Sequence, residues 1–472
     1  MISNFHQLHN FPRALSFIFV LLTLWAVVPR GLLAAEEQGP PGLSEKVSEA
    51  LQQKMKPLLD AKNWDGAMAV IDGVLFGLDP NGYDTAFLSD IKAKIFLQKN
   101  DYASAIAPME TTLRLADANK NFFDKKTVLD VVYFLAQIYY QEGTSSKDPS
   151  VQKNYFNKSS AYIKRWLQTT PKKNQEASLF YASILYNQAV VNPDKVDLEM
   201  INRVQIEVRE GLLTSLKPKE GFYVLLLASL QQTGDMAASA EVLEQMVKVK
   251  PDNRTYWLQL LATYLNLGGG TEKDEQKSRE NFARAINTME RAQALGLMQT
   301  PKDNYNLVTM YYNVGQFGKA TDLLYSGLKS GAIESDLKNW QLLAYSYQQI
   351  GRDDQAIAVL KEAGTAFPSG QIEFQIGQIY SQMDNRTAEA YSYYSKAVAK
   401  GGLEKPHSAY MFLAYTAFEL EKFEEALGAI NKTIGSADGQ KDTQAPRLKA
   451  AIEEAIKERE AAKAALESKK SL

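Results

Sequence analysis

The 472-residue sequence contains no cysteine, and this absence removes several kinds of site at once. Without thiols the chain forms no disulfide, no cysteine-based zinc site and no thiol nucleophile. Histidine is almost as rare: of the three in the chain, His6 and His9 precede an apolar run near the N-terminus and only His407 follows it. The sequence therefore predicts no catalytic residues, no metal site built on paired histidines and no histidine-based triad.

A strongly basic region is also missing, because the formal net charge is −2. Nucleic-acid-binding chains carry a basic footprint that neutralises phosphates, so we expect no nucleic-acid partner. The glycines at 268–270 follow no predicted strand and precede no Gly-Lys-Ser/Thr, which argues against a phosphate-binding loop. We therefore predict that the protein is not an enzyme and has no cofactor and no small-molecule substrate; carboxylate chemistry in the N-terminal half is the alternative.

Residues 1–35 have the composition of a secretory signal. Arg13 precedes the apolar run 14–28, and small residues ending at Ala35 precede a polar segment. The run is shorter than the roughly 20 apolar residues that a membrane-spanning helix needs. We therefore expect cleavage after Ala35 and a periplasmic protein. The alternative is an uncleaved segment that anchors the chain in the inner membrane, facing the periplasm, so that contact with the membrane would come only through this anchor or through partners.

The segment 337–368 contains two apolar helical stripes separated by a break at Gly351. Large side chains recur at helical spacing on the first stripe, and small ones on the second let a neighbouring helix approach closely. Glycine suits a left-handed helix end, and a proline cannot continue a helix. The residues that define the unit are, in order, Trp340, Leu343, Ala344, Tyr347, Ala356, Leu360, Ala363 and Pro368.

Related units follow one another from about Gly221 to Gly435, with a period of about 34 residues. The pattern W-x2-L-A-x2-Y…A…A-x4-P at Trp340–Pro368 resembles the tetratricopeptide-repeat family, and Trp257, Leu260 and Tyr264 occupy matching places in another unit. One such unit cannot bury its own apolar face and needs neighbours of the same kind. The resemblance implies an all-α fold, a right-handed superhelical solenoid of tetratricopeptide-like helical hairpins.

The strength of the repeat pattern varies along the chain. We expect an inserted loop at 144–149, where Ser, Thr, Lys and Pro interrupt a hairpin. The last segment is rich in Ala, Glu and Lys, as expected of a solvated helix that caps a solenoid. The predicted organisation is a signal peptide at 1–35, a linker at 36–48, degenerate hairpins at 49–218, a tetratricopeptide array at 219–435, and a polar loop with a C-terminal capping helix at 436–472.

In tetratricopeptide proteins the first helices of the hairpins line a concave surface, and the resemblance implies a peptide-binding groove there. Amides bond peptide backbones, and tyrosine supplies contact area at low entropic cost. Several of these aromatic residues could instead belong to the core between repeats. Gln341 stands where the dicarboxylate-clamp subfamily has lysine, which argues against that mode of binding. The candidate groove residues are Tyr305, Tyr312, Asn313, Gln341, Tyr345, Gln348, Gln349, Phe374, Gln378 and Tyr415.

The layout also resembles a narrower group of exported bacterial repeat proteins, which are described as components of the TonB system. The stretches that carry this resemblance are 251–260, 400–403 and the signal peptide. It implies a periplasmic protein-interaction scaffold that serves TonB, ExbB or ExbD. The alternative is an adaptor or chaperone for outer-membrane or export clients. The partner, the peptide motif, the oligomeric state and the continuity of the two repeat blocks stay open.

Overall fold

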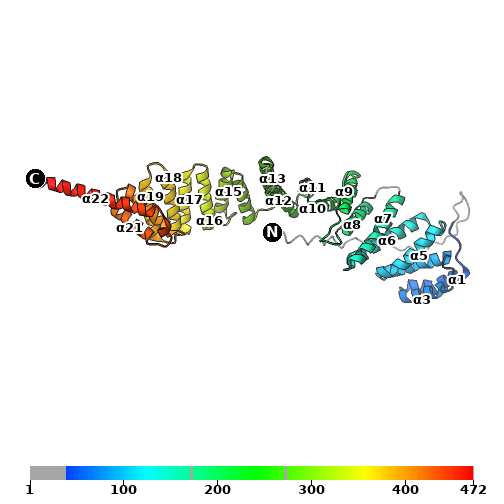
Figure 1. Cartoon of the computed structure of the whole chain (residues 1–472). Coiled ribbons are helices and arrows are strands. Elements are labelled where there is room, and N and C mark those ends of the chain that lie inside the picture. The colour runs from blue at the N-terminus through cyan, green and yellow to red at the C-terminus, as the bar shows by residue number, and fades with distance from the viewer. Residues whose placement is uncertain (1–38, 171–173, 271–273, 471–472) are drawn as a thin grey trace. The chain divides into compact units, whose positions relative to one another are not determined.

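The computed structural model describes residues 39–170, 174–270 and 274–470, with side chains to residue 466 (Figure 1). The predicted signal peptide, residues 1–35, lies outside these ranges. Every regular element within them is a helix, and inside each of the chain's two compact units successive helices pair as hairpins that stack on the next pair. The prediction of an all-α solenoid is confirmed. None of the described helices is long and apolar enough to cross a membrane.

The described chain forms two compact units. The first holds residues 39–146 and 157–169, and the second holds residues 147–156 and those from 170 onward. The helix α7 (Pro149–Thr169) contributes residues to both. The predicted boundary between 218 and 219 marks a change in how well the residues match the repeat pattern, and does not coincide with this division.

The first unit begins with a helical segment that the sequence assigned to a linker. Ser44 caps it by accepting a hydrogen bond from the backbone N–H of Val47, so the helix starts at Glu45 and the predicted linker 36–48 is too long at its C-terminal end. A buried stripe of Val47, Leu51 and Met55 packs this segment on its neighbours. The helices of this unit before α7 are α1 (Glu45–Glu49), the π-helix η2 (Ala50–Met55), α2 (Lys56–Asp60), α3 (Trp64–Leu75), α4 (Tyr83–Gln98), α5 (Tyr102–Ala118) and α6 (Lys125–Ser145).

The loop between α6 and α7 is shorter than the predicted range 144–149. The helix α6 runs to Ser145 and α7 starts at Pro149, so only residues 146–148 connect them. The polar residues that suggested a loop are tolerated at an exposed helix end, and proline is suited to the first helical position. Asp148 caps α7 by accepting hydrogen bonds from the backbone N–H groups of Ser150 and Val151.

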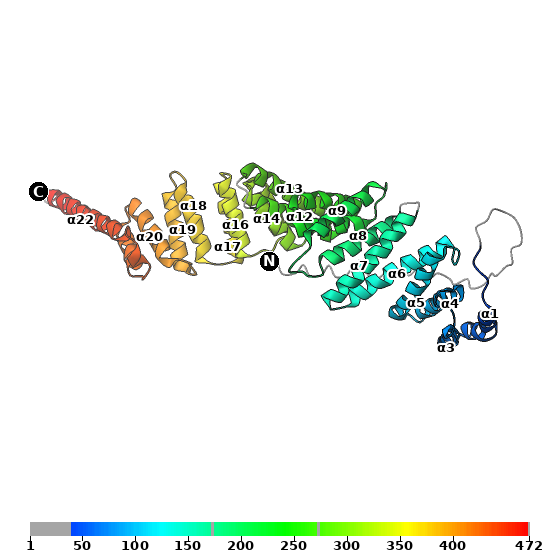
Figure 2. The same cartoon turned by 45° about the vertical axis from the view of Figure 1, so that its right-hand side comes forward.

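The second unit continues the alternation of first and second helices and is drawn from green to red in Figures 1 and 2. From α4 onward, even-numbered helices up to α20 are the first helices of hairpins and odd-numbered ones up to α21 are the second. The helices after α7 are α8 (Gln175–Ala189), α9 (Leu198–Leu213), α10 (Glu220–Thr233), α11 (Met236–Val249), α12 (Arg254–Gly268), α13 (Glu275–Ala294), α14 (Pro301–Asn313), α15 (Phe317–Ser330), α16 (Leu337–Gln349), α17 (Asp353–Ala366), α18 (Gly370–Gln382), α19 (Thr387–Lys400), α20 (Pro406–Glu419), α21 (Phe423–Ile434) and α22 (Ala445–Lys470).

A left-handed residue makes the turn inside most hairpins. Gly315 and Gly351 have φ values of 74° and 69°, and each ends a first helix. The N–H of the next residue bonds back across the helix end; for example, Arg352 N–H donates to the Tyr347 carbonyl at 2.9 Å. The same turn position is occupied elsewhere by Lys62, Asn100, Gly234, Asn385 and Glu421, all with positive φ. The repeat is thus visible in the backbone even where the side-chain pattern is weak.

Large side chains from the first helices and small ones from the second fill the core. Trp257 and Trp340 are 2% and 6% exposed, and Leu343 is fully buried. Ala320 and Ala356 are also fully buried, on the second helices α15 and α17, where a larger residue would hold the helices apart. These are the positions that the repeat pattern assigned to the core.

The helix α22 closes the array at its C-terminal end. Ala445 and Ile452 are fully buried against Ala414, Ala417 and Ile430 of the last hairpin. Farther along, the side chains become exposed, and Leu466 is 59% exposed. In both views this part of α22 extends beyond α21 (Figures 1 and 2).

Candidate functional site

The first helices α14, α16, α18 and α20 each present an exposed stripe of side chains, which we call the first-helix stripe. Buried leucines or isoleucines set its register: Leu307, Leu343 and Ile376 occupy equivalent positions. Two residues after them come Thr309, Tyr345 and Gln378, with Tyr415 in the same place on α20. The stripe lies within the second compact unit.

Nine of the ten predicted groove residues lie on this stripe with accessible side chains. Tyr305, Tyr345 and Tyr415 are 38%, 48% and 51% exposed. Asn313 and Gln349 are exposed as well. The half-buried members are Tyr312, Gln341, Gln348 and Gln378. Their role in binding stays a prediction, because the structure contains no partner.

Side chains of the stripe contact one another across neighbouring hairpins. The rings of Tyr312 and Tyr345 lie 5.8 Å apart between centroids, which joins α14 to α16. Gln341 Nε2 donates a hydrogen bond to Gln375 Oε1 at 3.1 Å, which joins α16 to α18. The negative charge of the nearby Glu419 raises the pKa of Tyr415 above its ordinary value. From α14 to α18 the stripe is therefore a continuous surface of aromatic rings and amides.

Phe374 is the exception among the predicted groove residues. It is 7% exposed, and its ring packs 5.6 Å from that of Tyr394 and 5.8 Å from that of Phe412. The assignment of Phe374 to an open surface is therefore corrected: its large apolar ring belongs to the core between two hairpins. Phe374 occupies the same place in its repeat as Gln341 does on α16, but its ring is turned toward the core.

The stripe also contains accessible residues that were not among the predicted ones. Phe412 is 40% exposed and stacks on Tyr394 at 5.6 Å, and Gln375 accepts the hydrogen bond from Gln341. Gln375 directly follows the predicted Phe374, and Phe412 occupies the equivalent place on α20. The exposed face of a helix is wider than one residue, so the neighbours of the predicted residues also belong to it.

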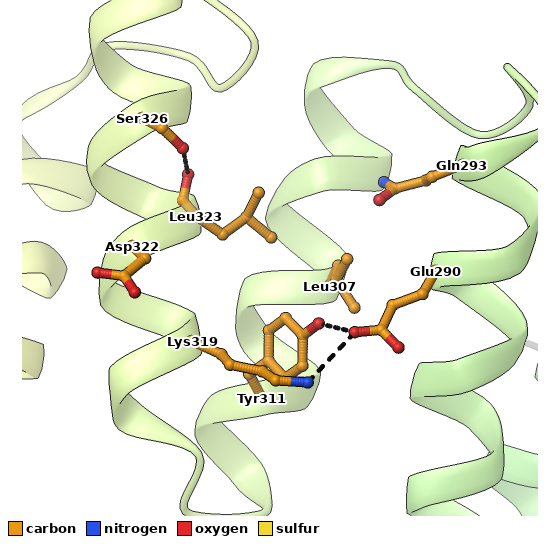
Figure 3. Close-up of a pocket in the computed structure, with 8 residues that line it drawn as sticks. All are labelled: Glu290, Gln293, Leu307, Tyr311, Lys319, Asp322, Leu323 and Ser326. Carbon is orange, nitrogen blue, oxygen red and sulfur yellow. Dashed lines mark hydrogen bonds and ion pairs between the residues drawn. The ribbon is translucent and has the colours of Figure 1, made fainter.

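A second recurring arrangement joins consecutive hairpins (Figure 3). Glu290 on α13 accepts a hydrogen bond from the hydroxyl of Tyr311 on α14, and Lys319 on α15 approaches the same carboxylate at 3.5 Å. These three residues line an open hollow of about 500 Å³, together with Gln293, Leu307, Asp322, Leu323 and Ser326. Burial, reinforced by the bond to Glu290, raises the pKa of Tyr311, so its hydroxyl stays a donor at neutral pH.

Two other junctions repeat this combination of tyrosine, glutamate and cation. Tyr264 on α12 donates to Glu244 on α11 at 3.3 Å, and Arg291 on α13 binds the same carboxylate at 3.1 Å. In the first unit Tyr139 donates to Glu110 at 2.6 Å, and Lys158 approaches that carboxylate at 3.4 Å. We call this arrangement the junction clamp.

The junction clamp is suited to holding hairpins together. Each carboxylate is already engaged by a phenol and a cation, so it is not free to act as a base. Within the described ranges, no three His, Asp or Glu side chains are placed to hold a metal ion. The carboxylates of the junction clamp are therefore structural.

No family model matches the sequence, and no curated protein matches it. Solved structures do show likeness. A tetratricopeptide-repeat protein called YrrB, described as having an unusual peptide-binding site, is 17% identical over 44% of this chain and 96% of its own, with a TM-score of 0.30. The tetratricopeptide domain of P58(IPK) is 14% identical over 88% of this chain and 99% of its own, with a TM-score of 0.22. A tetratricopeptide protein from Parabacteroides merdae is 12% identical over 60% of this chain and 98% of its own, with a TM-score of 0.26.

At these sequence identities and TM-scores, the functions of the similar proteins are not transferred to this chain. The repeat character rests instead on this chain itself, on the recurring left-handed turn, the equivalent buried positions and the alternation of large and small core residues. The described part of the chain is an all-α array of tetratricopeptide-like helical hairpins.

Proposed function

We propose that the protein is a non-catalytic scaffold that binds a segment of a partner protein along the first-helix stripe. The observation that carries this is the exposure of Tyr345 and Tyr415 in equivalent places on separate hairpins. Exposed tyrosines cost little entropy on binding, and amides such as Gln349 can bond a peptide backbone. None of the predicted groove residues is charged, which suits an extended, uncharged segment.

The proposed place of action is the periplasm, where the scaffold would be an accessory component of a TonB–ExbB–ExbD system. The signal-like composition of residues 1–35 and the resemblance of 251–260 and 400–403 to exported repeat proteins support this proposal. Contact with the membrane would then come through the partner or through an uncleaved signal anchor.

The experiment captures partners from the native envelope by cross-linking the exported chain and identifying them by mass spectrometry. Near-stoichiometric recovery of TonB, ExbB or ExbD is the expected result. A broad mixture of outer-membrane proteins would instead favour the adaptor or chaperone function.

A paired variant connects this capture to the stripe. Gln341→Glu with Tyr345→Glu places two negative charges where the partner would lie, and should abolish capture while circular dichroism stays unchanged. The matched control, Gln355→Glu with Ala358→Glu, adds the same charge on the exposed side of α17 and should leave capture intact. Full capture by the stripe variant would contradict the proposal.

A further inference from the structure

The junction formed by α17, α18 and α19 departs from the junction clamp. At the clamped junctions a glutamate follows a buried core residue: Glu244 follows Leu243, and Glu290 follows Met289. At the equivalent place on α17, after the buried Leu360, stands Lys361. The tyrosine of the clamp is retained, because Tyr380 on α18 corresponds to Tyr311.

The second charged position of the clamp is also exchanged at this junction. Glu389 on α19 precedes the buried Ala390, in the place where Lys319 precedes the buried Ala320. The exchanged charges do not pair with each other. Glu389 is instead bound by Arg386 of the same helix.

Lys361 is left among tyrosines. Although partial burial lowers the pKa of Lys361, the neighbouring hydroxyls of Tyr393 and Tyr380 leave that pKa above its ordinary value, so the ammonium is charged at neutral pH. The rings of Tyr380 and Tyr393 stack with centroids 5.5 Å apart. Lys361 Nζ lies 5.6 Å and Lys396 Nζ 4.6 Å from the centroid of Tyr393. We call these four residues the basic tyrosine cluster.

No carboxylate within the described ranges forms an ion pair with either lysine, and both lysines are exposed. The acidic residues near Lys361 in sequence interact with other cations. Glu362 forms an ion pair with Lys329, and the charge of Asp354 raises the pKa of Arg386. The basic tyrosine cluster therefore presents two exposed lysines beside two half-buried tyrosines, and no carboxylate among the described residues forms an ion pair with these lysines.

We propose that the basic tyrosine cluster binds a carboxylate from an acidic segment of a partner protein. At the clamped junctions the chain itself supplies the carboxylate that accepts from the tyrosine and the cation. At this junction the donors are present and the acceptor is missing, so charge complementarity points to an Asp or Glu side chain from outside. The cluster shares no residue with the first-helix stripe. It would be a second binding site for a partner protein, in addition to the one in the proposed function.

The test measures binding of a fluorescein-labelled hexaglutamate peptide to the purified protein by fluorescence anisotropy at low ionic strength. We expect binding of hexaglutamate and none of hexaglutamine. Lys361→Gln with Lys396→Gln should weaken binding by about tenfold or more, since two charge-assisted contacts are lost. The control Lys248→Gln with Lys457→Gln removes the same charge from exposed residues without ion pairs among the described residues, and should change the affinity less than about twofold.

A single substitution separates binding from stability. Lys361→Glu supplies the acid that other junctions carry, so it should abolish hexaglutamate binding while the melting temperature stays the same or rises. The proposal is overturned if the wild-type protein does not bind hexaglutamate, if Lys361→Glu still binds it, or if the control pair weakens binding as much as the cluster pair.

Discussion

Gly377 lies directly against the ring of Tyr394: a Cβ at position 377 would be 2.7 Å from the ring carbons Cδ1 and Cε1. Tyr394 is fully buried, and its hydroxyl is 2.9 Å from that of Ser381, so the ring has no room to move aside. Gly377→Ala should therefore lower the free energy of unfolding by about 1–3 kcal/mol through overpacking. Urea denaturation followed by circular dichroism measures the change.

Gly428 provides the matched control on α21. A Cβ there would meet nothing within 4 Å. Gly428→Ala should stabilise the protein by about 0.4–1 kcal/mol, because alanine reduces the entropy of the unfolded chain. Equal effects at the two positions would contradict the role assigned to the contact between α18 and α19.

Tyr311→Phe tests the junction clamp directly. The substitution keeps the ring but removes the hydroxyl that donates to Glu290, and this should cost about 1 kcal/mol. Faster amide hydrogen exchange in α13 and α14 is the expected local readout. Tyr305→Phe, on an exposed ring, should leave both stability and exchange unchanged, and an identical response of the two variants would argue that the hydroxyl of Tyr311 contributes nothing.

Glu110 makes the clamp of the first unit sensitive to acid. Burial raises the pKa of its carboxyl, but hydrogen bonds from Tyr139 and Tyr162 and the charge of Lys158 outweigh this and hold the pKa below its ordinary value of 4.5. A carboxyl with a lowered folded pKa stabilises the fold above the ordinary value, and this contribution is lost as the pH falls through the folded pKa.

The measurement compares the free energy of unfolding of Glu110→Gln with that of the wild-type protein, from neutral pH to below 4.5. The variant should be less stable at neutral pH, and the gap should close as the pH falls below 4.5. Glu241→Gln, on the exposed side of α11 and away from its ends, should show a much smaller gap. A gap for Glu110→Gln that persists in acid would rule out the ionised carboxylate as its source.

The capping role of α22 predicts a contrast between two of its residues. Ile452→Ala should cost about 2–5 kcal/mol, because Ile452 is fully buried against the last hairpin. Leu466→Ala should cost less than about 0.5 kcal/mol, since that side chain is 59% exposed. Thermal unfolding of both variants tests whether the N-terminal half of α22 is docked and its C-terminal half is solvated. Similar losses of stability in the two variants would contradict this difference between the halves.

The repeat itself was predictable because its cause is local. Trp340, Leu343 and Ala356 were assigned to the core from their spacing, and all three are buried. A left-handed helix end at Gly351 followed from the chemistry of glycine, and the structure has it. The ends of elements were less predictable: α1 starts inside the predicted linker, and α6 extends into the predicted loop, because polar residues are compatible with an exposed helix as well as with a loop.

The helical repeat could be predicted from the amino-acid sequence alone, because apolar periodicity and turn residues act over a few neighbouring positions. Which side chains of the candidate surface are accessible depends on packing between helices, and it became known from the three-dimensional structure. Tyr345 and Phe374 stood in the same predicted groove, yet one is 48% exposed and the other is 7% exposed. The difference depends on packing: Phe374 fills the space beside Tyr394 and Phe412 from helices farther along the chain, and no local pattern specifies that contact. The exchange of charges that leaves Lys361 without a carboxylate likewise became visible only when equivalent junctions could be compared in space.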